Sequence, residues 1–364
     1  MRLFKRAATM VAVLGLTVGC GGGGGGQSDP AAAGGNADTA VTFGGPGGAT
    51  GDLFKAAIAD FEKQTGIKVT YQEGSIQEVY SKVLAGTQTN RPDIDVYYAN
   101  DASTYTGEAQ GVYQPVDESL IPNISQLAPG SLPDNKTGVT LYQTLQVMIY
   151  NTDLLKQAGL EPPKSWADMW NADYTKCGLV LAEPHGAAKE WNMMNYVASG
   201  GDLYDIDATL AKLTEVENRG EITSVVESAQ NVADEVAAGK GCIGSVNQGK
   251  VLDSINNGAP LDFTIPDEGT AFLTNRLEVV KDAPHPKAAN MLINWLIDLP
   301  AQQRFYQDGG WTPANVHMQP ATDGTAARIM LPSALGDTKI LQPEPAKSDL
   351  DAWLKKFQSL VAQS

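Results

Sequence analysis

The chain has 364 residues and a formal net charge of −16, with 42% hydrophobic and 19% charged residues. So acidic a chain is unsuited to nucleic acid or to anionic lipid surfaces, because Lys and Arg carry those contacts. The length exceeds what a single core usually serves, so we expect two lobes.

The chain begins with an export signal. Arg2, Lys5 and Arg6 precede an apolar run over residues 7–18, and Gly19 and Cys20 follow. The run is about a dozen residues, short of the roughly twenty that span a bilayer as a helix, and no later stretch approaches that length. We expect residues 1–19 to be removed, which takes the formal charge from −16 to −19 because three cations leave.

A lipid anchor is predicted at the new N-terminus. Residues 16–20 (LTVGC) resemble a bacterial lipobox, in which the cysteine thiol receives diacylglycerol. The run from Gly21 to Gly26 favours a flexible tether next to the anchor. An ordinary secretory cleavage site with a chance cysteine is the alternative. The prediction is a lipidated Cys20, a tether over 20–37, and a fold from residue 38 onward on the outer face of the cell membrane.

Two further cysteines, Cys177 and Cys242, remain for an oxidising compartment. An even pair there favours a disulfide, with two buried thiols as the alternative. The C-x-x-C spacing is absent, which argues against a redox motif or a cysteine metal site. We expect no metal and no cofactor.

The first part of the fold alternates strands and helices. Residues 41–43 predict a strand, residues 44–48 a glycine-rich turn, and the apolar stripe of a helix follows at Phe54, Ala57, Ile58 and Phe61. Gly66 ends that helix. Further elements are a strand over 67–71, a helix around 79–84 and a strand over 94–99. The β-α-β-α-β order implies a mostly parallel sheet.

The same alternation returns after Tyr142. Strands are predicted near 145–151, 178–181, 242–246 and 261–265, and a helix over 225–238. Residues 320–345 are rich in turn formers and are expected to wrap the surface. The last helix, over 350–361, carries an apolar stripe that we expect to dock on a lobe.

Signatures of catalysis are missing. There is no G-x-S-x-G elbow and no H-E-x-x-H, and the three histidines, His185, His285 and His317, lie far apart in the sequence. The glycine turn departs from G-x-G-x-x-G because Thr50 stands at the last glycine. Its N–H groups could hold an anion at the helix N-terminus, or the segment is a plain turn. We expect no enzyme, with a surface hydrolase as a weaker alternative.

One long segment resembles a known family. Residues 147–156 (VMIYNTDLLK), Gly159-Leu160 and residues 162–169 (PPKSWADM) resemble the crossover region of bacterial extracellular solute-binding proteins of ABC importers. Residues 59–69, 92–96, 286–296 and 310–315 resemble other segments of that family. The resemblance covers nearly all of residues 38–320 and is greatest to the spermidine/putrescine-type subgroup and its iron- and phosphonate-binding relatives.

The resemblance implies a periplasmic-binding-protein-like (type II) α/β fold, with two lobes joined by hinge crossovers and each built on a mostly parallel sheet flanked by helices. We expect lobe one over 38–142 and 268–312 and lobe two over 143–267 and 313–364. It also implies a monomer that closes on a small ligand and presents it to an ABC permease and ATPase. A sensory or partner-binding lipoprotein on the same fold is the alternative.

Loops that follow strands supply the candidate ligand contacts, because parallel α/β sheets bind ligands beyond the carboxyl ends of their strands. The alternative role for a loop Asp or Asn is to form the turn. The candidates are Gly45, Gly48, Thr50, Asn100, Asp101, Glu183, His185, Asn247, Thr274 and Asn275, with Tyr142 and Trp311 as aromatic walls.

The ligand class stays open between a polyamine-like amine and an organic anion such as a phosphonate or carboxylate. Polyamine binders of this family sandwich the ligand between aromatic rings and bind its ammonium groups with carboxylates. Here residues 272–275 (FLTN) stand where a tryptophan and an aspartate are expected, which leaves Asp101 and Glu183. The pair Tyr97-Tyr98 lies in a first-lobe strand, unlike the second-lobe tyrosine pair of iron binders. The residue types favour a polar organic ligand.

Overall fold

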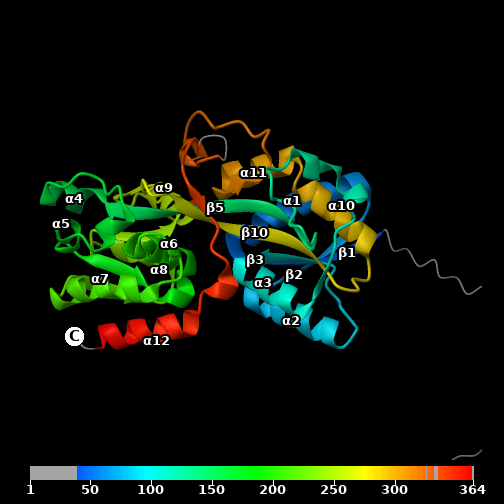
Figure 1. Ribbon diagram of the computed structural model, residues 1–364. Helices are drawn as coiled ribbons and strands as arrows, with labels where there is room; N and C mark the ends of the chain where they lie inside the picture. The colour runs from blue at the N-terminus through cyan, green and yellow to red at the C-terminus, as the bar shows by residue number, and fades with distance from the viewer. Residues whose placement is uncertain (1–38, 325, 332–334, 363–364) are drawn as a thin grey trace, which may run out of the picture. The chain divides into compact units, whose positions relative to one another are not determined.

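The computed structural model describes residues 39–324, 326–331 and 335–362 (Figure 1). The predicted signal peptide, the lipid on Cys20 and the glycine tether lie outside the described residues. Within the described ranges, no helix is both long enough and apolar enough to cross a membrane.

The first lobe has the predicted β-α-β-α-β order. Its strand β1 pairs in parallel with β2 on one side and with β3 on the other. Helix α1 buries Phe54, Ala57, Ile58 and Phe61, the stripe expected from the sequence. The elements of this part are β1 (Ala40–Gly45), α1 (Gly48–Thr65), β2 (Lys68–Glu73), α2 (Ile76–Gln88), β3 (Val96–Asn100), α3 (Asp101–Gln110) and β4 (Tyr113–Gln114).

The second lobe is also α/β, with β6 parallel to both β7 and β8. Its elements are α4 (Thr152–Ala158), α5 (Ala172–Thr175), β6 (Leu179–Ala182), α6 (Ala188–Ser199), α7 (Ile206–Asn218), β7 (Ile222–Val226), α8 (Ala229–Ala237), β8 (Ile243–Asn247), α9 (Gln248–Asn256) and β9 (Leu261–Thr264). The predicted helix over 225–238 is wrong at its start. Val225 belongs to β7 and pairs with Leu181, so its match to the helical spacing is a coincidence.

Two long antiparallel strands join the lobes, β5 (Gly138–Asn151) and β10 (Thr270–Val280). The strand order is β2-β1-β3-β10-β5-β8-β6-β7, so the parallel strands at both ends meet an antiparallel pair in the middle (Figure 1). Val139 and Leu141 of β5 pack in the first core, and Met148 and Ile149 pack in the second. The strand predicted from 145 therefore begins earlier, and one continuous strand serves both cores.

The helices and strands that follow β10 contribute to both lobes. They are α10 (Pro286–Leu296), α11 (Leu299–Gly309), β11 (Thr312–Pro313), β12 (Ile340–Leu341) and α12 (Leu350–Val361). Leu292 and Phe305 of α10 and α11 pack in the first core, whereas Phe357 of α12 packs in the second. The prediction that the last helix docks on a lobe is confirmed. The exact lobe boundaries stay a prediction.

The segment expected to wrap the surface is in fact partly buried. Ile329 and Leu331 are 5% and 2% exposed and pack with Leu252 of α9 and Tyr306 of α11. The apolar side chains of this segment thus form a small core with α9 and α11. The prediction missed it because it rested on the number of turn residues in 320–345 and gave no weight to the apolar residues between them.

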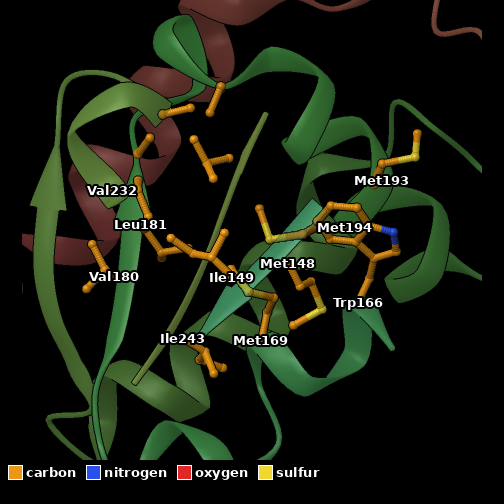
Figure 2. Packing of buried hydrophobic residues seen from close by; sticks show 14 of the residues in the cluster. Met148, Ile149, Trp166, Met169, Val180, Leu181, Met193, Met194, Val232 and Ile243 are labelled. Carbon is orange, nitrogen blue, oxygen red and sulfur yellow. The ribbon is translucent and has the colours of Figure 1, made fainter. Parts of the chain in front are cut away.

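The second core is rich in sulfur and aromatic side chains (Figure 2). Met148 of β5 and Met194 of α6 lie beside Trp166, whose indole N–H donates to the carbonyl of Gly269 at 2.9 Å. A buried indole needs such an acceptor, and flexible methionines fill the irregular space around it. This core fixes the start of α6, the helix that carries the charged part of the site described below.

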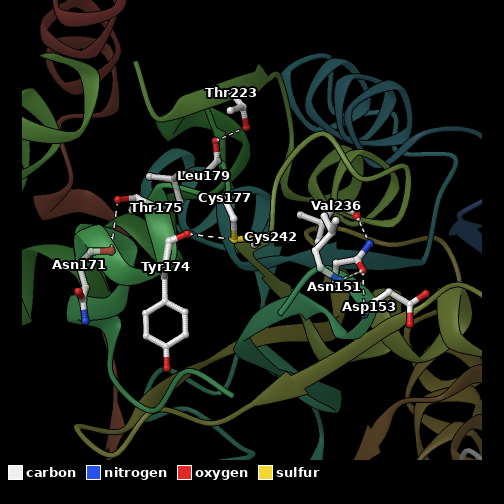
Figure 3. Close-up of a disulfide and its surroundings, with 11 residues drawn as sticks. Asn151, Asp153, Asn171, Tyr174, Thr175, Cys177, Leu179, Thr223, Val236 and Cys242 are labelled. Carbon is white, nitrogen blue, oxygen red and sulfur yellow. Dashed lines mark hydrogen bonds between the residues drawn. A yellow bond between two sulfur atoms is a disulfide. The ribbon is translucent and has the colours of Figure 1, made fainter. Parts of the chain in front are cut away.

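Cys177 and Cys242 form a disulfide, with Cα atoms 5.5 Å apart and a sequence separation of 65 (Figure 3). The pairing expected from the sequence is present in the structure. It ties the turn after α5 to the start of β8. Nearby, the amide of Asn151 donates to the carbonyl of Val236 at 2.9 Å and so links β5 to α8.

Candidate ligand-binding cleft

Two adjoining cavities lie between the first-lobe and second-lobe residues. The first has a volume of about 240 Å³ and the second of about 230 Å³. Both are lined by Asn100, Gln230, Asn247 and Leu273, so they form one continuous cleft. Because its walls come from both lobes, a molecule held there would contact both at once.

Asn100 and Asn247 are placed in the cleft by helix capping. Each ends a strand and caps the following helix, α3 or α9, through its Oδ1 atom, which accepts from the N–H of Ser103 or Lys250 at 3.0 Å. This geometry is the usual one for an N-cap asparagine. The Nδ2 groups donate to no residue in the described ranges, so two amide donors are available to a ligand.

An ion pair joins the two walls of the first cavity. The Nζ atom of Lys189, on α6, lies 3.1 Å from Oδ2 of Asp101, on α3, and also donates to the carbonyl of Phe272 at 2.7 Å. Asp101 additionally accepts from the N–H of Thr274 at 3.1 Å. The two side chains are 9% and 20% exposed. Asp101 therefore lines the first cavity, and Lys189 already balances its charge.

The carboxyl group of Glu190 lines the same cavity in the first turn of α6. It is 4% exposed, and burial raises its pKa to about 7, against the opposing effects of its own backbone N–H and of Lys189. Within the described residues, no other side chain donates a hydrogen bond to it. Glu190 is thus a carboxyl in the wall of the cavity without a protein cation of its own.

Gln146 lines the first cavity from the middle of β5. It shares one face of the strand with Tyr142 and Thr144, which line the second cavity, because side chains alternate along a strand. Gln146 is fully buried, and neither Oε1 nor Nε2 has a hydrogen-bond partner among the described residues. Such unsatisfied amides are rare in folded proteins, since each costs about 1–3 kcal/mol.

The second cavity has an aromatic wall. Tyr142 and Trp311 stack with their ring centroids 4.0 Å apart and their planes inclined by 15°. The hydroxyl groups of Tyr142 and Tyr98 are hydrogen-bonded, and the Tyr98 hydroxyl donates to Oδ1 of Asn275 at 2.9 Å. This wall contains three of the predicted site residues.

Two charged side chains complete the second cavity. They are Lys250, which lies 3.4 Å from Asp234, and Asp253, whose pKa is raised by burial. The two charges are of opposite sign, so this part of the cleft favours neither a cation nor an anion strongly.

The end of the chain forms another wall of the first cavity. We define the C-terminal strap as residues 340–350, of which Pro343, Pro345, Ser348 and Leu350 line the cavity. Its strand β12 pairs in parallel with Thr270 and Ala271 of β10, and its turn at 345–347 contacts α3. Figure 1 shows this orange-red segment passing β10 on its way to α12.

The strap is held mainly by second-lobe residues. Ser348 accepts from the amide of Asn192 at 3.1 Å, and the N–H of Glu344 donates to the hydroxyl of Tyr204 at 2.8 Å. At its end, His185 Nε2 lies 2.9 Å from a carboxylate oxygen of Asp351. His185, a predicted site residue, thus lies at the cavity edge beside the strap.

Five predicted site residues are not among those that line the cleft. Gly45 ends β1, and Gly48 and Thr50 lie in the first turn of α1. Glu73 accepts from the Lys55 ammonium here, and the Gly48 N–H helps to lower the pKa of its carboxyl, so the protein's own carboxylate lies at this helix N-terminus. Glu183 accepts from the amide of Gln358 at 3.3 Å, outside the cavities. Thr274 is buried beside Asp101.

The described residues contain no group of three His, Cys, Asp or Glu side chains suited to a metal ion. The chemistry of the cleft is that of binding: amide donors and acceptors, the Asp101–Lys189 ion pair, the carboxyl groups of Glu190 and Asp253, and stacked rings. Two α/β lobes around such a cleft define a solute-binding protein of the ABC-transporter class.

Comparison with known proteins agrees. A model of the family described as bacterial extracellular solute-binding protein matches residues 56–331, and the chain belongs to that family. The spermidine/putrescine-binding periplasmic protein 1 of Haemophilus influenzae is 24% identical over 271 residues, covering 72% of this chain and 73% of the relative. The family and this relative are binding proteins rather than enzymes.

Solved structures show the same fold at low identity. An ABC transporter protein from Clostridium perfringens has a TM-score of 0.73 at 17% identity, over 88% of this chain and 99% of the other. A spermidine/putrescine substrate-binding protein from Streptococcus pneumoniae has a TM-score of 0.67 at 18% identity, over 88% and 99%. These likenesses confirm the predicted two-lobed α/β fold.

Proposed function

We propose that the protein captures a small polar organic ligand between its lobes and delivers it to an ABC permease on the outer face of the cell membrane. The observation that carries the proposal is the continuous cleft, with both lobes and the strap in its walls. A ligand that contacts both lobes favours their closure, and the closed form is the one a permease would recognise.

The proposed contacts are those predicted residues that line the cleft: Asn100, Asp101, Tyr142, His185, Asn247, Asn275 and Trp311. Among the relatives, the Haemophilus influenzae protein is named for spermidine and putrescine. The range of ligands to test therefore includes amines as well as phosphonates and carboxylates.

The binding step is tested by thermal unfolding of the purified protein against polyamines, amino acids, phosphonates, carboxylates and sugars. A ligand at a hundred times its dissociation constant stabilises the folded state by about 2.7 kcal/mol, which moves the midpoint visibly. Alanine at Asn247 should weaken the response to a ligand that gives one. No response to any class would count against capture in this cleft.

We also propose that Cys20 carries a lipid anchor and that residues 20–37 are a tether. Metabolic labelling with radioactive palmitate should label the wild-type protein and leave a Cys20→Ser variant unlabelled. Equal labelling of the two would refute the anchor and leave the binding function in place. Uptake of the bound ligand that depends on ATP and on the protein would separate transport from a sensory or partner-binding role.

A further inference from the structure

The charges of the first cavity do not balance. Its charged or titratable side chains are Asp101, His185, Lys189 and Glu190. Asp101 pairs with Lys189, and His185 lies next to Asp351. Glu190 is 4% exposed and forms no ion pair with a side chain of the described residues. When Glu190 is ionised, the cavity has one buried negative charge in excess.

An uncompensated buried carboxylate is costly, and burial accordingly raises the pKa of Glu190 to about 7. An ammonium group in the cavity would remove that cost, because it supplies an opposite charge and a charge-assisted hydrogen bond. A carboxylate or phosphonate at the same place would add a like charge and increase the cost.

Gln146 provides a second and independent sign of a missing partner. Its buried amide lacks a partner for both its donor and its acceptor, and it lies on the cavity-facing side of β5. Its cross-strand neighbour in β8 is Asn247, whose own amide donor is available. The Gln146 amide and the Asn247 amide donor thus lie side by side without hydrogen-bond partners among the described residues. Unpaired polar groups in a cavity wall are the groups with which a ligand can form hydrogen bonds.

We propose that the natural ligand carries one ammonium group, which the Glu190 carboxylate binds, and a second polar group, which the Gln146 amide binds. This inference deepens the proposed function and depends on it. Within the first cavity a single ammonium fits better than several, because Asp101, the other carboxylate that lines this cavity, is held by Lys189. A second ammonium at Asp101 would leave the Lys189 ammonium unpaired.

The test uses monoamines with a polar far end, such as 4-aminobutanoate, 4-aminobutanamide and 4-amino-1-butanol. Each is paired with the compound in which a hydroxyl replaces the ammonium group, and putrescine and spermidine are added as polyamines. Binding to the purified full-length protein is measured by calorimetry and by the melting temperature. We expect at least one monoamine to bind and its hydroxyl counterpart to bind at least about thirtyfold more weakly.

Three variants locate the contact. Glu190→Gln should weaken monoamine binding by at least about thirtyfold, since it removes the charge and keeps the shape. Glu183→Gln is the matched control, because Glu183 lies outside the cavities, and it should leave binding within about twofold. Gln146→Met should weaken binding by about tenfold while the protein still folds.

Four results would overturn the inference: unchanged monoamine binding in Glu190→Gln, binding of the hydroxyl compounds in preference to the amines, binding of polyamines alone, or no binding by any amine. Preference for the hydroxyl compounds and binding of polyamines alone would leave the proposed capture of a small ligand intact. If neither the amines nor the hydroxyl compounds bind, the result also counts against the proposed function.

Discussion

Lys189 and Asp101 face each other from different lobes, with Nζ and Oδ2 3.1 Å apart and with one carbonyl and one amide completing their hydrogen bonds. Asp101→Asn should lower the free energy of unfolding by about 3 kcal/mol, because it leaves the Lys189 ammonium largely buried without its counter-charge. Urea unfolding measures this cost.

The matched control for this pair is Lys136–Glu118, which is 2.6 Å long but about half exposed on both sides. Glu118→Gln should cost less than about 1 kcal/mol, since water screens the pair. Adding Lys189→Met to Asp101→Asn should recover part of the loss. Equal costs for Asp101→Asn and Glu118→Gln would show that the cross-lobe pair does not stabilise the fold.

Gln146 and Gln302 are both fully buried glutamines and differ in their partners. Gln302 donates to the carbonyl groups of Leu141 and Leu296 and accepts from the N–H of Ala314, whereas the amide of Gln146 has no partner among the described residues. Gln302→Met should lower the free energy of unfolding by about 2–4 kcal/mol, because it leaves those carbonyl and N–H groups buried without hydrogen-bond partners.

Gln146→Met removes an unsatisfied amide and should be neutral or stabilising in the ligand-free protein. Chemical denaturation of both variants without ligand makes the comparison. A loss at Gln146 as large as the loss at Gln302 would mean that the Gln146 amide is satisfied in the free protein, for instance by water.

Glu278 predicts a dependence of stability on pH. It is fully buried on β10, accepts from the Thr104 hydroxyl at 3.2 Å, and lies near Arg276 and Glu108. Burial raises its pKa from 4.5 to about 7. The folded protein therefore holds the proton more tightly than the unfolded chain, so the stabilisation is complete below about pH 4.5 and is lost as the pH rises through 7.

Glu278→Gln isolates this effect from other titrating groups, including Glu190, whose contribution has the same sign. The stability of the variant relative to wild type should increase by up to about 3 kcal/mol between pH 4.5 and pH 8. Denaturation curves across this range give the difference. A difference that does not change with pH would show that Glu278 is not protonated in the folded protein.

The disulfide between Cys177 and Cys242 closes a loop with a sequence separation of 65. A loop of this length corresponds to about 4 kcal/mol of stabilisation in the chain-entropy model. Reductant should lower the melting temperature of wild type, and a variant with serine at both positions should melt at that lower temperature whether or not reductant is present. Equal melting with and without reductant, while free thiols become titratable, would contradict the prediction.

Sequence reasoning found part of the cleft for a physical reason. Asn100 and Asn247 end strands and Asp101 directly follows one, and the ends of strands converge on such a site, so local order suffices to place them. Lys189 and Glu190 lie inside a helix, where the usual interpretation of charges is a solvated face. Only the packing of α6 against β10 turns them inward.

Other residues of the cleft were missed for the same reason, because their positions depend on contacts between segments that are far apart in the sequence. Gln146 stands in an apolar strand and looks like an interruption of the core, and its orientation is evident only from β5 passing through both lobes. The strap is about 140 to 170 residues from β6 and α6 in sequence, and no local pattern links Pro343 to Glu190. The sequence left the glycine turn open between an anion site and a plain turn, and in the structure the Glu73 carboxylate lies at this helix N-terminus.

The strap makes the first cavity depend on helix α12. Residues 340–350 supply one wall of that cavity, and α12 follows them directly. Trp353 and Phe357 dock this helix on the second core. The packing of one helix against the second core therefore helps to hold a wall of the cavity that lies between the lobes.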